Sequence, residues 1–177
     1  MPQKIIAFTG AKTVGKSTIA KALSQALQDA SILSFATPLR EMLWSMGVQY
    51  EYLHNHKEDK IPSLGKSARE LLCSLGTDWG RNMVDENIWV WAMSRQVEGA
   101  MKDFVIIDDC RFKNEAEWIK SQGGLIFKLT RDGHEYTNDH VTETPLDQKF
   151  IDDVFDCENI EETITQVMDR IELTFDL

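Results

Sequence analysis

The sequence predicts an α/β fold, in which a parallel β-sheet carries helices on both faces. Short apolar segments alternate with segments of helical periodicity, a Gly-rich loop joins the first such pair, and no repeat or Pro/Gly-rich linker interrupts the chain. Parallel strands need long crossover connections, and these are usually helices that bury both faces of the sheet. We therefore expect a single domain over residues 1–177.

The first third of the chain alternates strand and helix. Lys4–Phe8 is predicted as a buried strand because it is apolar and short, and apolar residues then recur at helical spacing after the Gly-rich loop. A second strand is expected at Ile32–Phe35 and a helix at Pro38–Met46, where proline suits the first turn. The next segment, Val48–Leu64, is polar and is expected to be irregular.

The middle of the chain is predicted to be helical. We expect one helix at Lys66–Leu75 and a second that Thr77 caps after Gly76 and that ends at about Val84. A third helix should run from Glu86 to about Met101. This helical part spans about residues 38–101.

The last part of the chain returns to alternating strands and helices. Phe104–Asp108 is the clearest central strand, and Phe112–Gln122 is predicted as the helix that follows it. The remaining predicted elements are a strand at Leu125–Leu129, a polar loop at Thr130–Pro145, a short strand at Val154–Phe155 and a closing helix at Ile160–Leu173.

Length and composition favour one soluble, folded unit. The 177 residues, 42% of them hydrophobic, suffice for one substantial core and are too few for two ordinary domains. No stretch approaches the roughly 18 apolar residues of a membrane span. The first eight residues hold one Lys and a short apolar run, unlike a signal peptide. We therefore expect a cytoplasmic protein.

Cysteine and histidine do not indicate a metal site or a disulfide framework. Cys73, Cys110 and Cys157 are odd in number and widely spaced, without a Cys-x-x-Cys pair, so we expect buried free thiols. The sequence His54-Asn55-His56 has no third ligand nearby, and we expect no metal there.

The net charge of −10 disfavours a partner that is itself a polyanion. Residues 135–177 hold 13 Asp and Glu against two basic residues, whereas residues 1–134 are nearly balanced. Nucleic-acid binding is therefore not expected. Small phosphorylated ligands need only a local cluster of basic residues, and they fit the composition.

A phosphate-binding loop is the strongest motif in the chain. Residues 10–18 read Gly-Ala-Lys-Thr-Val-Gly-Lys-Ser-Thr and match Gly-x-x-x-x-Gly-Lys-Ser/Thr, with a strand before and a helix after. Its glycines let backbone N–H groups turn around phosphate oxygens, and the helix N-terminus adds a favourable dipole. We expect Lys16 to reach the β- and γ-phosphates and Ser17 to hold Mg²⁺. The expected nucleotide-binding residues are Gly10, Ala11, Thr13, Val14, Gly15, Lys16, Ser17 and Thr18.

Two carboxylates and an arginine follow the clearest predicted strand. A phosphate loop needs a metal-supporting carboxylate at the end of a neighbouring strand, and Asp108 and Asp109 both qualify. Asp109 is our first choice, whereas Asp108 is equally compatible with a helix cap. Arg111 lies at the ligand-binding edge of such a sheet, and an ion pair with Glu115 is its alternative. The expected catalytic residues are Lys16, Asp109 and Arg111.

A phosphoryl acceptor that itself carries a phosphate must be bound close to the nucleotide. Arginines in the helical part at about residues 38–101 are candidates for binding this acceptor phosphate, so we expect this part to be the acceptor-binding region. A guanidinium group holds phosphate bidentately, and the candidates are Arg40, Arg69 and Arg81. Each is equally compatible with a solvated helix surface. Trp79, with Trp89 and Trp91, is a candidate for stacking on a base, although tryptophan at helical spacing is more often part of a core.

Four segments resemble the deoxynucleoside monophosphate kinases of tailed bacteriophages, a branch of the P-loop kinases. They are the loop Gly10–Thr18, the stretch Ala68–Trp89, the segment Asp109–Ala116 and the lid signature His140–Glu143. The loop is shared by many unrelated ATPases, so the other three make the resemblance specific. The resemblance implies an enzyme that uses ATP and Mg²⁺ in the cytoplasm, which is that of the host if the chain is phage-encoded. It also implies that Arg69, Arg81 and Arg111 serve the acceptor phosphate.

The resemblance also implies a mobile lid at about residues 130–145, in which Glu143 belongs to the substrate site. Arg131 is the one permanent cation that the sequence places in this lid. We expect it to stack on adenine or to approach the phosphates of ATP.

We expect direct in-line transfer from Mg²⁺-ATP to a deoxynucleoside monophosphate. Another small-molecule P-loop kinase, such as one for dephospho-coenzyme A, is an alternative that an acceptor screen would separate. A regulatory GTPase switch is a rival of another class, but Asn55–Asp59 fits its guanine-reading motif only loosely and Asp109–Phe112 lacks the switch glycine. The preferred base, the selectivity against ribose and homodimer formation stay open.

Overall fold

The structure, a computed structural model, describes residues 3–134 and 144–176. It has two compact units, which we name the sheet unit (residues 1–34 and 96–177) and the helical unit (residues 35–95). The residue range of the helical unit nearly matches the acceptor-binding part predicted at about 38–101. The single-domain organisation stays a prediction. Within the described residues, no helix is both long and apolar enough to cross a bilayer.

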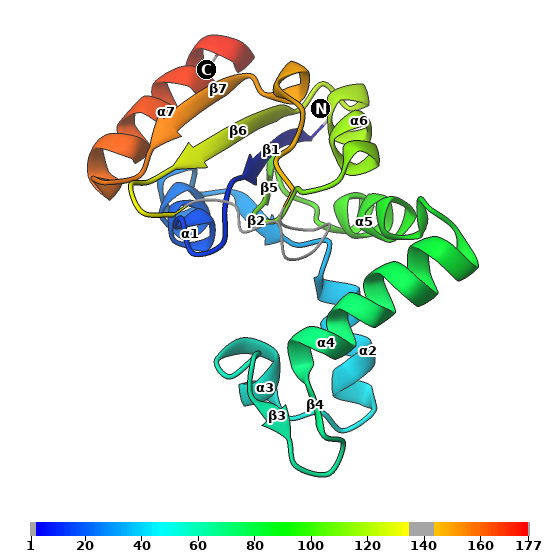
Figure 1. Ribbon diagram of the computed structural model, residues 1–177. Coiled ribbons are helices and arrows are strands. Elements are labelled where there is room, and N and C mark those ends of the chain that lie inside the picture. The colour runs from blue at the N-terminus through cyan, green and yellow to red at the C-terminus, as the bar shows by residue number, and fades with distance from the viewer. Residues whose placement is uncertain (1–2, 135–143, 177) are drawn as a thin grey trace. The chain divides into compact units, whose positions relative to one another are not determined.

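The sheet unit is built on five parallel strands, as predicted. The strands are β1 (Lys4–Thr9), β2 (Ala30–Leu33), β5 (Phe104–Ile107), β6 (Leu125–Thr130) and β7 (Asp153–Asp156). Their order is β2-β5-β1-β6-β7, and every neighbouring pair is parallel (Figure 1). Strand β2 is shifted from the Ile32–Phe35 predicted, because Ala30 pairs with Phe104 and Leu33 with Ile107.

Helices cover both faces of this sheet. Helices α1 (Lys16–Ala26) and α7 (Ile160–Phe175) contact each other and share one core with the strands. Helix α6 (Lys113–Ser121) packs against β6 with Ile119 fully buried, and the short 3-10 helix η3 (Gln148–Phe150) contacts α6. Successive residues of a strand point to opposite faces of the sheet, and both faces are covered here. Residues on both faces of a central strand are therefore buried, which explains the continuous apolar runs in the sequence.

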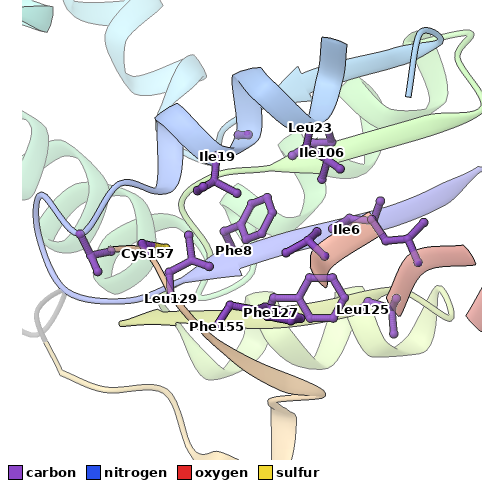
Figure 2. Close-up of a cluster of buried hydrophobic side chains, with 14 of the residues drawn as sticks. Ile6, Phe8, Ile19, Leu23, Ile106, Leu125, Phe127, Leu129, Phe155 and Cys157 are labelled. Atoms are coloured by element: carbon purple, nitrogen blue, oxygen red, sulfur yellow. The ribbon is translucent and has the colours of Figure 1, made fainter. Parts of the chain in front are cut away.

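The main core lies between α1, α7 and one face of the sheet. Ile6 and Phe8 from β1 gather with Ile19 and Leu23 from α1 and with Phe127 from β6 (Figure 2). All five side chains are at most 1% exposed, and burial of each stabilises the fold by about 1.5–3 kcal/mol. This packing anchors β1 and α1 on either side of the Gly-rich loop.

The strand order brings the carboxyl ends of β1 and β5 together. Their register pairs Ala7 with Ile107, the last residue of β5. From β1, the sheet extends through β5 to β2 on one side and through β6 to β7 on the other. Such a reversal of strand order opens a crevice at the carboxyl edge, where ligands of open α/β sheets bind.

The helical unit is formed by short elements around a core of its own. They are α2 (Thr37–Ser45), α3 (Tyr50–His54), the antiparallel pair β3 (Lys60–Ile61) and β4 (Lys66–Ser67), α4 (Ala68–Cys73), the π-helix η1 (Ser74–Val84) and the start of α5 (Ile88–Gly99). Leu43, Leu53 and Ile61 are buried in this core.

The prediction that Val48–Leu64 is irregular was wrong, because this segment contains α3 and β3. These elements are too short to show periodicity, and their apolar residues are buried one at a time. The helix predicted from Lys66 begins at Ala68 instead. Ser67 accepts a hydrogen bond from the Glu70 backbone N–H and the Glu70 carboxylate accepts one from the Ser67 N–H, which forms a capping box.

The predicted helix start at Thr77 was also wrong, because the helix continues through Gly76 as a π-helix. The Gly76 carbonyl accepts hydrogen bonds from Arg81 Nη1 at 2.9 Å and from Trp89 Nε1 at 2.8 Å. A Cβ atom on Gly80 would lie 2.5 Å from the Trp89 ring, so glycine permits this packing. Side chains of the π-helix itself and of α5 thus bind the Gly76 carbonyl.

The three cysteines are free thiols, as expected. Cys110 and Cys157 are buried and Cys73 is half-buried. Burial, with smaller contributions from the charges of Glu115 and Asp109, raises the pKa of the Cys110 thiol well above its ordinary value. Its burial and protonated state make Cys110 a core residue of the sheet unit.

Candidate active site

The loop between β1 and α1 is shaped to expose its backbone. Gly10 has a φ of +145°, and a Cβ atom there would lie 2.5 Å from the Leu129 carbonyl oxygen, so only glycine fits. Gly15 at +113° and Thr13 at +62° complete the turn. Ala11 and Val14 are buried at 3% and 1% exposure and hold the loop on the core. Backbone N–H groups at a helix start have few carbonyl acceptors one turn earlier, so the start of α1 suits an anion.

The Lys16 ammonium group is held inside the loop. Its Nζ atom donates hydrogen bonds to the carbonyl oxygens of Gly10 at 2.8 Å and Ala11 at 2.6 Å. The residue is only 8% exposed. Phosphate oxygens bind an ammonium group more strongly than neutral carbonyls do, so the side chain is placed to exchange these partners for a nucleotide.

Two aspartates at the end of β5 have different serine partners. Asp108 Oδ2 accepts a hydrogen bond of 2.6 Å from Ser17 Oγ, whereas Asp109 Oδ2 accepts one of 2.6 Å from Ser34 Oγ. A hydroxyl and a carboxylate at this edge are the oxygen ligands that Mg²⁺ takes in phosphate-loop enzymes. Asp108, and not Asp109, our first choice, is the carboxylate that lies beside Ser17, so Asp108 becomes the better candidate for the metal role.

Glu115 is a buried capping residue and not the surface residue that the ion-pair alternative for Arg111 assumed. Glu115 is 1% exposed, and its carboxylate accepts hydrogen bonds from the backbone N–H groups of Arg111 at 2.8 Å and Phe112 at 3.0 Å. These bonds cap α6 and fix the backbone of Arg111, whose side chain is half-buried. Sequence spacing alone could not separate a capping carboxylate from an ion-pair partner.

The three arginines proposed for the acceptor lie in the helical unit, in different environments. Arg69 Nε is 3.7 Å from Glu58 Oε1, and Arg81 holds the Gly76 carbonyl. Arg40 Nε is buried and has no hydrogen-bond acceptor among the residues that the structure describes. The Arg40 side chain therefore has a buried donor that a ligand atom could satisfy.

The tryptophans divide between core and surface. Trp89 is 4% exposed and belongs to the core, whereas Trp79 is 40% and Trp91 is 60% exposed. The ring centroids of Trp79 and Trp89 are 6.3 Å apart. Of the three, Trp79 combines exposure with a position within the π-helix and a ring contact to Trp89, and it stays a candidate for stacking on a base.

Only the beginning and end of the predicted lid lie within the described residues. Arg131 Nε is 3.9 Å from Glu158 Oε2, a long surface contact. His134 Nδ1 lies 2.9 Å from Thr13 Oγ1, so the first part of the lid segment contacts the phosphate loop. Glu143 lies outside the described residues, and its role stays a prediction.

The two histidines at 54 and 56 have separate surroundings. The His54 ring stacks on Tyr50, with centroids 4.1 Å apart, and His56 Nδ1 lies 3.0 Å from Asp59 Oδ2. In the described parts of the chain, no group of three His, Cys, Asp or Glu side chains is placed to hold a metal. Sequence reasoning missed the Tyr50–His54 pair, because α3 is too short to show a pattern.

Comparison with known proteins points to one family. The family model for deoxynucleotide monophosphate kinase matches residues 51–168. The deoxynucleoside-5′-monophosphate kinase of Escherichia phage T5 is 29% identical over 108 residues, 57% of this chain and 43% of that protein. A protein of Acanthamoeba polyphaga mimivirus, provisionally assigned as a deoxynucleotide monophosphate kinase, is 30% identical over 159 residues, 80% of this chain and 81% of its own.

A solved structure of thymidylate kinase from Candida albicans is similar in fold. Its TM-score is 0.52 at 18% sequence identity, and the alignment covers 97% of this chain and 92% of that one. The match to the phage T5 protein spans less than half of that protein's length.

Proposed function

Because the chain belongs to the deoxynucleotide monophosphate kinase family, we propose that it transfers the γ-phosphoryl group of ATP to a deoxynucleoside 5′-monophosphate. The observation that supports this most is the arrangement of Lys16, Ser17 and Asp108 at the carboxyl edge of the sheet. A lysine inside a phosphate loop and a serine paired with a carboxylate are the parts that phosphoryl transfer requires.

The sheet unit would bind the phosphate donor. Backbone N–H groups of residues 10–18 would surround the β- and γ-phosphates, and Lys16 would leave its carbonyl partners to bind them. Ser17 and Asp108 would hold Mg²⁺, which when bound neutralises charge on the phosphates. Arg111, fixed by the Glu115 cap, would stabilise the phosphoryl group in the transition state.

The acceptor would be held by the helical unit, with Arg69, Arg81 and Trp79 as contacts. The acceptor phosphate oxygen would attack the γ-phosphorus directly, so no covalent enzyme intermediate is needed. The lid at about 130–145, with Arg131 and Glu143, would close over the donor and exclude water, which otherwise competes with the acceptor.

A coupled assay of ADP formation tests this function. The wild-type chain with Mg²⁺-ATP should turn over with at least one deoxynucleoside monophosphate and far more slowly with no acceptor or with dephospho-coenzyme A. A matched Lys16→Ala variant, shown to be folded by circular dichroism, controls for contaminating kinases. Turnover only with dephospho-coenzyme A, or equal ATP hydrolysis with and without every acceptor, would refute the proposal.

A further inference from the structure

The helical unit has a pocket of about 210 Å³ between α2 and α3. The lining residues used below are Arg40, Glu41, Trp44, Tyr50, Leu53 and His54. Sites for drug-sized ligands are usually about 300–1,000 Å³, so this pocket suits one planar ring system rather than a whole nucleotide. All of its lining residues lie in the helical unit, so its geometry is set within that unit.

Aromatic rings form the sides of the pocket. The rings of Tyr50 and His54 are stacked, with centroids 4.1 Å apart and planes 20° from parallel. Trp44 and Tyr50 are 58% and 56% exposed, although large aromatic side chains gain most when they are covered. Leu53 is 2% exposed and provides an apolar floor. A flat, apolar ligand would cover these faces.

The polar groups of the pocket include both donors and acceptors. Arg40 Nε is buried without an acceptor among the described residues, and an unmet buried donor of this kind is costly. The Glu41 carboxylate adds an acceptor. Burial, followed by the positive charges of Arg40 and Lys57, lowers the pKa of His54, so its imidazole is neutral near pH 7 and carries one donor and one acceptor.

This chemistry favours a base over a phosphate. The Glu41 carboxylate would repel a phosphate dianion, and the aromatic sides would give it no benefit. A nucleobase has a flat face for the rings and a polar edge for the arginine and the carboxylate. Guanine offers O6 and N7 as acceptors for an arginine, and its N1–H and N2–H groups are donors for a carboxylate. Adenine has the same size, but an amino group replaces O6.

We infer that this pocket seats the base of the acceptor nucleotide and that Arg40 and Glu41 select guanine over adenine. The inference depends on the proposed kinase function and extends it to the choice of substrate. It changes two expected roles: Arg40, which the sequence assigned to the acceptor phosphate, would contact the base, and Trp79, which does not line the pocket, would not be the ring on which the base stacks.

The test compares two purine nucleotides of equal size. We expect kcat/KM for deoxyguanosine monophosphate to exceed that for deoxyadenosine monophosphate by about tenfold or more, because a bidentate arginine contact discriminates bases by about 1–3 kcal/mol. Arg40→Ala should remove most of this ratio by lowering the guanine value. An equal loss for both nucleotides would mean that Arg40 binds phosphate, and the inference would be wrong.

A pair of histidine variants provides the control. His54→Gln should raise KM for both purine nucleotides, since it removes the ring that stacks on Tyr50. His56→Gln, two residues away and outside the pocket lining, should leave KM and the guanine-to-adenine ratio unchanged. If both substitutions act alike, the pocket does not hold the base.

Binding of deoxyguanosine, which carries no phosphate, gives a readout that does not need turnover. It should quench Trp44 fluorescence in the wild-type chain, and the Trp44→Phe variant identifies the signal. Binding by deoxyguanosine but not by deoxyadenosine supports the inference, whereas binding by neither, in a chain that phosphorylates deoxynucleotides, overturns it. A chain that phosphorylates no deoxynucleotide would instead refute the proposed function.

Discussion

Replacing Asp108 by asparagine tests which of two adjacent carboxylates supports the metal ion. Asp108 Oδ2 accepts a 2.6 Å hydrogen bond from Ser17, and Asp109 Oδ2 accepts an equally short one from Ser34. Asparagine keeps the size of the side chain and removes its charge. Each charge-assisted bond is worth about 1.5–3 kcal/mol, so the two variants should lose similar stability. Stability alone therefore does not separate the roles.

Magnesium dependence does separate them. Asp108→Asn replaces one carboxylate oxygen by an amide nitrogen and removes the negative charge proposed to hold the ion, so we expect the Mg²⁺ concentration for half-maximal rate to rise about tenfold or more. Loss of a fixed electrostatic group at a reacting centre typically lowers kcat by about 10²–10³, and we expect a fall of about 100-fold at saturating Mg²⁺. That factor corresponds to about 2.7 kcal/mol in the activation free energy.

The matched control is Asp109→Asn, which makes the same chemical change one residue later. It should leave the half-saturating Mg²⁺ concentration within about twofold of wild type. In the same way, Ser17→Ala should raise this concentration and Ser34→Ala should leave it nearly unchanged. Mn²⁺ binding in the presence of a non-hydrolysable ATP analogue, measured by electron paramagnetic resonance, checks the ion directly. A larger shift in Asp109→Asn than in Asp108→Asn would refute the assignment and restore Asp109 as the metal ligand.

Four further changes have defined outcomes. Lys16→Ala should abolish turnover while circular dichroism stays native, and retention of about a tenth of the activity would contradict its role. Arg111→Ala should raise the acceptor KM and lower kcat, with poor rescue by Arg111→Lys because the bidentate geometry is lost; unchanged kinetics in both variants would remove Arg111 from the site. Gly80→Ala should destabilise the fold by about 1–3 kcal/mol in urea unfolding, because its Cβ would lie 2.5 Å from the Trp89 ring, and a neutral result would mean that Trp89 moves freely. Arg131→Ala should raise the KM for ATP more than that for the acceptor, and a defect confined to the acceptor would argue against a lid that covers ATP.

Much of the sheet unit could be predicted because its signals are local. Central strands are continuous apolar runs, as in residues 5–8 of β1 and in Phe104–Ile107, since both of their faces are buried. The helix Ile160–Phe175 keeps one apolar face over its whole length. The phosphate loop is equally local, because its backbone turn, lysine and serine lie within nine residues. The family resemblance depended on such contiguous motifs.

The helical unit was predicted less well, because its elements are short and depend on distant partners. Helix α3 spans only Tyr50–His54, too short for a helical period to show. The π-helix through Gly76 is held by Arg81 and Trp89, and no propensity within the segment indicates it. The pocket beside α3 also joins residues from separate elements, so composition could not reveal it.

The different serine partners of Asp108 and Asp109 show what only the tertiary structure decided. From the sequence by itself, a carboxylate was expected beside the phosphate loop, because Val105–Asp109 ends a buried strand. Neighbouring residues of an extended chain point to opposite sides, so one aspartate had to lie toward α1 and the other away from it. Ile106 lies in the same core as Ile19 of α1, and Asp108 continues that alternation to reach Ser17. Strand register and helix packing decide which face of the sheet α1 covers, and they join residues about ninety positions apart in the sequence. No local sequence pattern therefore predicts which aspartate lies beside Ser17.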